Sequence, residues 1–346
     1  MITGRPALQG GRVRISSVFT AITACGCLCV TLVFGAAPAA AESVHLAVIV
    51  GIEGQPEHGE LFRRWAATLI DTAGKFGIPR ERVVHLAEAE DKSVTGKPTK
   101  AEIEKAFEKI AMQATDDDVV MVVLIGHGTF DGKVAKFNLR GPDMTPGDFA
   151  PLLKKVRAKQ IVFVNTASAS GPFVPELAGP GRTIVTATRS GAEQFSTLFG
   201  GHFIDALASE AADADKNKRV SILEAFNTAR REVATAYQRE GIMLTEHALL
   251  DDSGDGKGVL EPTADGPDGR VASILSLGSA ADAVPLPADP RLRQLYVDRR
   301  DLEKRVESLK LLKGGMDPAR YASELEKLLT DLALKTQEIR AVEGKK

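Results

Sequence analysis

The sequence has few cysteines, few aromatic residues and no excess of charge of either sign. Its three cysteines, Cys25, Cys27 and Cys29, all lie near the N-terminus, and aromatic residues make up only 5% of the chain. Because 44 Lys and Arg face 46 Asp and Glu, the chain lacks the basic surplus of a nucleic-acid-binding protein. With 44% hydrophobic and 26% charged residues, the composition excludes collagen-like and wholly disordered classes and favours a globular protein.

Several motifs of catalysis and nucleotide binding are also missing. The chain has no Walker-type phosphate loop, no His-Glu-x-x-His zinc motif and no Gly-x-Ser-x-Gly elbow. Residues 51–54 (Gly-Ile-Glu-Gly) follow a predicted strand but do not form the dinucleotide fingerprint. An unrelated α/β hydrolase or a nucleotide-binding domain is therefore an alternative that no motif supports.

The first 41 residues have the pattern of a secretory signal peptide. Arg5, Arg12 and Arg14 precede an apolar stretch over residues 18–34, and the small residues 39–41 follow as a cleavage site. We expect an exported protein, periplasmic or secreted, with no transmembrane segment after cleavage. A retained membrane anchor and lipidation at Cys25 are the alternatives, although the apolar run continues past Cys25.

Cleavage after Ala41 would remove every cysteine from the protein. The mature chain would then have no disulfide, no thiolate metal site and no cysteine nucleophile. Cleavage also removes three Arg and no acid, so 41 basic residues face 46 acidic ones, a net charge of −5.

The remaining chain divides into an α/β region, a linker and a helical end. Over residues 42–262, apolar runs alternate with helical patterns, which predicts a three-layer α/β/α sandwich with a mostly parallel sheet. Residues 263–290 are rich in Pro, Gly, Ala and Asp, as is typical of a linker. Residues 291–346 predict a coiled-coil-like antiparallel helical hairpin. This hairpin either folds back on the α/β region or binds a protein partner. The predicted strands are 44–52, 83–86, 119–125, 161–165 and 183–187.

Two strand ends carry residues suited to chemistry. The strand over 119–125 runs into Gly126-His127-Gly128, and the strand over 161–165 runs into a loop that ends Ala167-Ser168-Ala169-Ser170-Gly171. Because side chains beyond neighbouring parallel strands converge, His127 and a hydroxyl from 166–170 should face each other. The alternatives are a histidine packed in a turn and hydroxyls that bind nearby backbone.

These two segments resemble the caspase/legumain superfamily of cysteine peptidases, nearest its legumain-like bacterial branch, over about residues 44–262. The resemblance implies a caspase-like fold, with His127 at the catalytic histidine and Ser168 at the nucleophilic cysteine. The amides of Gly128 and Ser168 would bind the oxyanion. The resemblance also implies a substrate pocket lined by a further three residues, Thr188, Arg189 and Ser190.

Serine in place of cysteine changes the expected activity. A thiol ionises near pH 8.5 but an alcohol ionises far less readily, so a serine nucleophile needs a close, oriented base. We therefore expect a weak or inactive peptidase that acts on or binds a peptide or protein. One alternative is a pseudopeptidase that binds its ligand through the crevice and the hairpin. The other is a serine enzyme in which Glu53 or Asp131 orients His127.

Residues 213–224 resemble a calcium-binding loop, in which alternate oxygen ligands precede a glutamate that opens the next helix. We expect a structural Ca²⁺ here, although Lys218 stands where the loop usually has glycine. The alternative is a polar loop that caps the helix. Residues 251–256 look similar but lack the final glutamate, which favours a solvated turn or a source of one or two ligands. The expected calcium ligands are Asp213, Asp215, Asn217, Arg219, Ser221 and Glu224.

Overall fold

The computed structural model describes residues 43–89, 91–278 and 286–344. The predicted signal peptide, its three cysteines and the possible lipidation site lie outside these residues. Within the described ranges, no helix combines the length and the apolar character needed to cross a membrane.

A six-stranded sheet forms the centre of the α/β region, in the order β2-β1-β3-β6-β7-β8. The first five strands in this order run parallel, and β8 is antiparallel to β7. Both faces of β1 and β3 are buried, which explains why these strands read as continuous apolar runs. The mostly parallel sheet is thus confirmed. The strands are β1 (Val44–Val50), β2 (Val83–Leu86), β3 (Val119–Ile125), β6 (Gln160–Asn165), β7 (Arg182–Thr186) and β8 (Leu249–Asp251).

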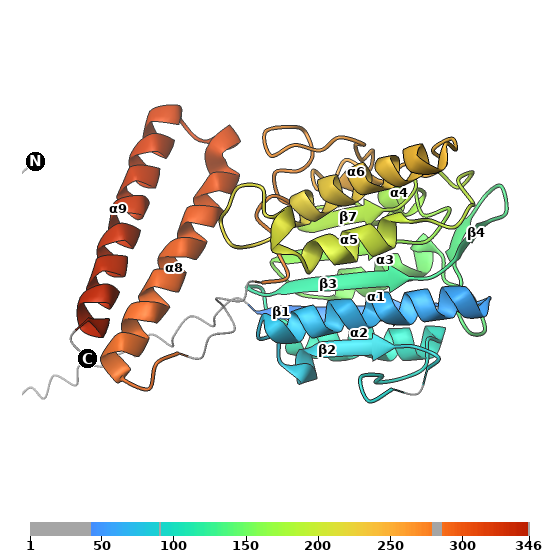
Figure 1. The fold of residues 1–346 in the computed structure, drawn as a ribbon, viewed down its shortest axis with the longest axis horizontal. Coiled ribbons are helices and arrows are strands. Elements are labelled where there is room, and N and C mark those ends of the chain that lie inside the picture. The colour runs from blue at the N-terminus through green and yellow to red at the C-terminus, as the bar shows by residue number, and fades with distance from the viewer. Residues whose placement is uncertain (1–42, 90, 279–285, 345–346) are drawn as a thin grey trace, which may run out of the picture. The chain divides into compact units, whose positions relative to one another are not determined.

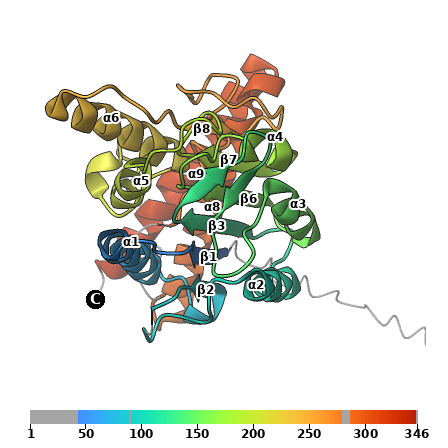
Figure 2. The same ribbon diagram turned by 90° about the vertical axis from the view of Figure 1, so that its right-hand side faces the viewer.

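Helices cover both faces of this sheet (Figures 1 and 2). One buried cluster joins alternate β1 residues to Trp65, Phe203 and Phe226, which lie on α1, α5 and α6. A second cluster joins the other β1 residues to Phe107 and Phe149 on α2 and α3, and includes α4. The predicted three-layer fold is therefore confirmed. The helices are α1 (Pro56–Lys75), α2 (Lys100–Gln113), α3 (Pro146–Lys155), α4 (Phe173–Leu177), α5 (Phe199–Leu207) and α6 (Ile222–Glu240).

Several short elements were not predicted from the sequence. A two-stranded ribbon, β4 (Gly128–Phe130) with β5 (Ala135–Phe137), follows β3 directly. Strands of three residues, including β8, carry too little alternation to be recognised in a sequence. Three single turns of 3₁₀ helix complete the described elements: η1 (Arg80–Arg82), η2 (Glu210–Ala212) and η3 (Lys313–Gly315).

Residues 263–278, expected as the first part of a linker, pack on the α/β region. Ala272, Leu275 and Leu277 are buried in the same cluster as Trp65. The carboxylate of Asp268 accepts the backbone N–H groups of residues 252 and 253. The packed region therefore continues past residue 262, because a few apolar side chains suffice to anchor a Gly-rich segment.

The C-terminal residues form two helices, α8 (Pro290–Leu312) and α9 (Pro318–Glu343). They run antiparallel, since Tyr296 near the start of α8 donates a hydrogen bond to Glu343 at the end of α9, 2.6 Å away. Leu302, Val306 and Leu328 are buried between them. The spacing of apolar residues thus predicted these helices correctly.

Candidate functional site

His127 and Ser168 follow two neighbouring strands, β3 and β6. Ser168 Oγ donates a hydrogen bond to the carbonyl oxygen of Gly128, 3.0 Å away. The Gly128 N–H donates to the same Oγ at 3.4 Å. The structure therefore brings together the two segments that the sequence singled out.

The contact between these segments requires a glycine at position 128. A Cβ atom added to Gly128 would lie far closer than 3.0 Å to the carbonyl oxygen of Ser168. Real Cβ atoms essentially never approach another atom so closely. Only glycine lets the two backbones come this near.

The turn that carries Ser168 is held by both backbone and side-chain hydrogen bonds. Ala169 has a left-handed backbone with φ of 53°, which costs a non-glycine residue about 1 kcal/mol. Its N–H donates to the carbonyl of Glu193 at 2.7 Å. Ser170 Oγ accepts the N–H groups of Ala187 and Thr188 at 3.1 and 3.2 Å. Ser168 itself is only 6% exposed, so this turn is enclosed within the fold.

His127 sits among apolar and aromatic groups. Its ring centroid lies 4.7 Å from that of His58 and 5.1 Å from that of Phe62. Burial lowers the pKa of His127, nearby His58 lowers it further, and a hydrogen bond with the backbone of Glu53 acts in the opposite direction. The imidazole is therefore neutral at neutral pH. Among the described residues, no carboxylate pairs with this ring and no hydrogen bond joins it to the Ser168 hydroxyl.

The two acids considered as partners of His127 have other roles. The Glu53 carboxylate forms an ion pair with Arg63 at 2.6 Å. Asp131 Oδ1 accepts the N–H groups of Lys133 and Val134 in the turn between β4 and β5. These hydrogen bonds lower the pKa of Asp131. Neither carboxylate orients the imidazole, so these described residues form no Ser-His-acid triad.

The segment after β7 contains a carboxylate that sequence reasoning missed. Glu193 Oε1 lies 2.7 Å from His247 Nδ1 and 3.1 Å from Arg189 Nε. Through its backbone carbonyl the same residue holds Ala169, next to Ser168. Glu193 thus links three distant parts of the chain at the edge of the sheet. No sequence signal pointed to it, since only the pairing of β7 with β8 brings His247 close.

The three residues expected to line a substrate pocket have different environments. Thr188 is fully buried, and its hydroxyl accepts the N–H of Gly171 at 3.0 Å. Arg189 is exposed, while the carbonyl of Ser190 accepts a hydrogen bond from the Thr188 hydroxyl. A cavity of about 310 Å³ beside this segment is lined by His247 and neighbouring residues but by none of these three.

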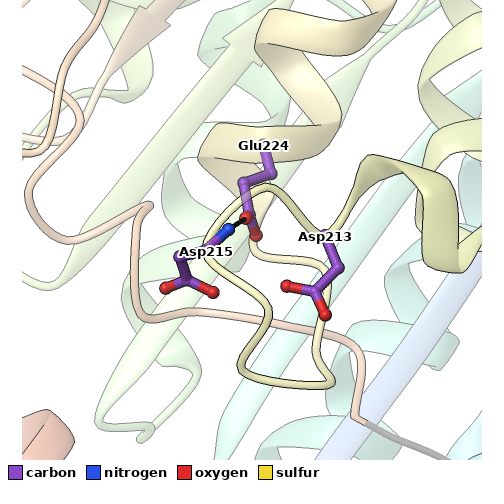
Figure 3. A group of neighbouring side chains, drawn as sticks. All are labelled: Asp213, Asp215 and Glu224. Carbon is purple, nitrogen blue, oxygen red and sulfur yellow. Dashed lines mark hydrogen bonds between the residues drawn. The ribbon is translucent and has the colours of Figure 1, made fainter.

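In the expected calcium loop, one oxygen from each of Asp213, Asp215 and Glu224 lies within 4.8 Å of the others (Figure 3). Lys218 has a left-handed backbone with φ of 70°, the conformation for which such a loop favours glycine. The Lys218 N–H donates to Asp213 Oδ2 at 2.9 Å. The lysine is therefore accommodated at a modest cost in strain.

The other expected ligands also lie in this loop. Asn217 Oδ1 accepts the N–H of Arg219, and Ser221 caps α6 in a reciprocal capping box with Glu224. Glu224 Oε1 accepts the N–H of Ala214 at 2.8 Å. The side chains of Asp213, Asp215, Asn217, Ser221 and Glu224 offer hard oxygens, the type that Ca²⁺ prefers, whereas Arg219 could offer only its backbone carbonyl. Hydrogen bonds of Ser221 and Glu224 also cap α6.

The similar segment at residues 251–256 forms a bend in which Ser253 and Asp255 are exposed, as expected of a solvated turn, but its first residue is not solvated. Asp251 is fully buried at the end of β8. Its carboxylate accepts the N–H groups of Gly254 and Gly256 at 2.9 and 2.7 Å. Within the described residues, it does not join the carboxylates of the calcium loop.

Comparison with known proteins finds a match to the sequence model of a peptidase family. Residues 91–250 match the sequence model of the Peptidase C13 family. The matched range contains both His127 and Ser168 and the segment after β7. A comparison with curated proteins gives no match.

Proposed function

Since residues 91–250 match the Peptidase C13 family, which is the legumain family, and form a legumain-like peptidase fold, we propose that the sheet edge with His127 and Ser168 binds a peptide and hydrolyses it weakly or not at all. The hydrogen bond from Ser168 Oγ to the Gly128 carbonyl supports this proposal most directly. The hydroxyl proton points to a backbone oxygen rather than to a base. A serine nucleophile depends on such a base far more than a cysteine does.

Any remaining peptide hydrolysis would depend on Ser168, His127 and Gly128. Ser168 Oγ would attack the peptide carbonyl, and its proton would pass to the neutral imidazole of His127. The N–H of Gly128, which donates to Ser168 Oγ in the resting site, would instead donate a hydrogen bond to the developing oxyanion. In a triad enzyme, replacing the acid behind the histidine by its amide lowers kcat about 10⁴-fold. A site without that acid therefore fits a peptide-binding protein better than an efficient peptidase.

Turnover of a peptide library tests this function. The comparison uses residues 42–346 with Ser168, with Ser168→Ala and with Ser168→Cys. We expect turnover only with Ser168→Cys, because a thiol needs less activation, and we expect His127→Ala to abolish it. Turnover by the unaltered protein that Ser168→Ala removes would instead establish a serine peptidase. If the Cys variant is inactive and no variant binds peptide, the function is refuted.

The non-catalytic alternative is a pseudopeptidase in which the sheet edge and the C-terminal helices bind a protein. Binding of library peptides to the Ser168→Ala variant separates this alternative from an enzyme. Retained binding without turnover by the unaltered protein supports the binding function.

We also propose that residues 1–41 are a signal peptide and that the protein is periplasmic or secreted. The N-terminal sequence of protein recovered outside the cytoplasm should begin directly after Ala41. An acylated N-terminal Cys25 would show lipidation instead, and an intact Met1 would exclude cleavage.

Structural calcium at residues 213–224 is a further part of the proposal. The gathered carboxylates of Asp213, Asp215 and Glu224 support it. Calcium should raise the melting temperature, and Asp213→Ala should abolish that increase. The exposed Asp117→Ala is the matched control and should preserve it. Equal melting with and without calcium would reject the site.

A further inference from the structure

Helix α9 has a second apolar face besides the one that packs on α8. A shallow hollow runs along this face and is lined by α9 residues alone, including Ala322, Leu329 and Ala333. The side chains of Leu329 and Leu334 are 48% and 54% exposed. The hollow therefore offers apolar surface that no other described element covers.

One acidic and one basic residue lie at equal distances on either side of the middle of this face. Glu326 and Arg340 each lie seven residues from Ala333, on either side of it. Seven residues make about two helical turns, so all three residues lie in line on one face. Neither Glu326 nor Arg340 forms an ion pair within the described residues, and both are exposed.

From this pattern we propose that two copies of the chain associate through α9, antiparallel and crossing at Ala333. In that arrangement Glu326 of each copy meets Arg340 of the other, which gives two ion pairs related by a twofold axis. A parallel arrangement would place like charges together. The pattern thus specifies both the partner, a second copy, and its direction.

The dimensions of helices fit this arrangement. Ala333 is small enough to let the helix axes approach to about 8 Å. With a rise of about 1.5 Å per residue, the charged residues lie roughly 10 Å from the crossing point. At a crossing angle of about 20° their positions diverge by only about 4 Å, within reach of long side chains. A crossing near 50° would separate them by about 9 Å, so the charges favour the shallow angle.

Disulfide cross-linking tests the crossing point directly. Residues 42–346 contain no cysteine, so a single introduced thiol reports one contact. Ala333→Cys should form a disulfide-linked dimer on mild oxidation, because Ala333 meets its own copy at the axis. Lys327→Cys, exposed about 120° round the helix, is the control and should remain monomeric. A monomeric Ala333→Cys variant, or equal cross-linking at both positions, overturns the proposal.

Charge reversal tests the direction of the pairing by sedimentation velocity. Glu326→Arg should weaken dimerisation at least fivefold, since it places two arginines together at both ends of the contact. The double variant Glu326→Arg/Arg340→Glu should restore dimerisation to within about threefold of the original. A protein that is monomeric at 100 µM, an unaffected single variant or an unrescued double variant would each refute the pairing.

Discussion

Replacement of Gly128 by alanine tests how closely the His127 and Ser168 segments approach. The added Cβ would meet the Ser168 carbonyl oxygen, and the two segments would have to separate by roughly 1 Å. Both are fixed, one to a ribbon strand and the other to a buried turn. The strain should therefore appear as lost stability rather than as a small local adjustment.

The expected size of this loss follows from the costs of overpacking. Forcing extra atoms into a packed site costs about 1–3 kcal/mol. For a domain of this size, each kcal/mol lowers the melting temperature by about 2–4 °C. Gly128→Ala should therefore melt about 2–12 °C below the unaltered protein, as measured by circular dichroism.

A second glycine serves as the matched control. Gly74 lies inside α1, and a Cβ added there meets nothing within 4 Å. Because alanine favours helix over glycine, Gly74→Ala should gain about 0.5–1 kcal/mol. If Gly128→Ala melted within 1 °C of the unaltered protein while Gly74→Ala melted higher, the close contact of the two segments would be wrong.

Three further changes probe the surroundings of the site and the fold. Glu193→Gln should cost about 1–3 kcal/mol in urea unfolding, since it removes the charged partner of His247; an unchanged midpoint would contradict this role. Burial raises the pKa of Asp148, but the hydrogen bond from Lys100 and those at the helix cap outweigh it and lower the pKa to about 2. The carboxylate should therefore contribute about 2 kcal/mol to the free energy of unfolding at neutral pH, and this contribution is lost as the pH falls from about 4 to 2. The stability difference between Asp148→Asn and the unaltered protein should vanish over that range, and a constant difference would refute the linkage. Ala169→Gly should be neutral or up to about 1 kcal/mol stabilising, because glycine accepts the left-handed backbone; a large loss would show that the methyl group matters more than the strain.

The sequence predicted the parallel strands because the central ones, β1 and β3, are nearly continuous apolar runs buried on both faces. It also predicted that His127 and Ser168 share one edge, since consecutive strand ends determine that placement. The Glu193–His247 pair was beyond prediction, because it depends on β8 pairing with β7 from a distant part of the chain. Likewise, no pattern showed that Asp251 would be buried and satisfied by the N–H groups of its own loop.

The reaction of the site with a peptidyl chloromethyl ketone, followed by intact mass, tests the central claim most directly. We expect the unaltered protein to stay unmodified, because Ser168 has no oriented base to activate it. The Ser168→Cys variant should gain one peptidyl group, since the peptide binds and the thiol reacts. An adduct at Ser168 or His127 of the unaltered protein would show an activated serine site and contradict this account.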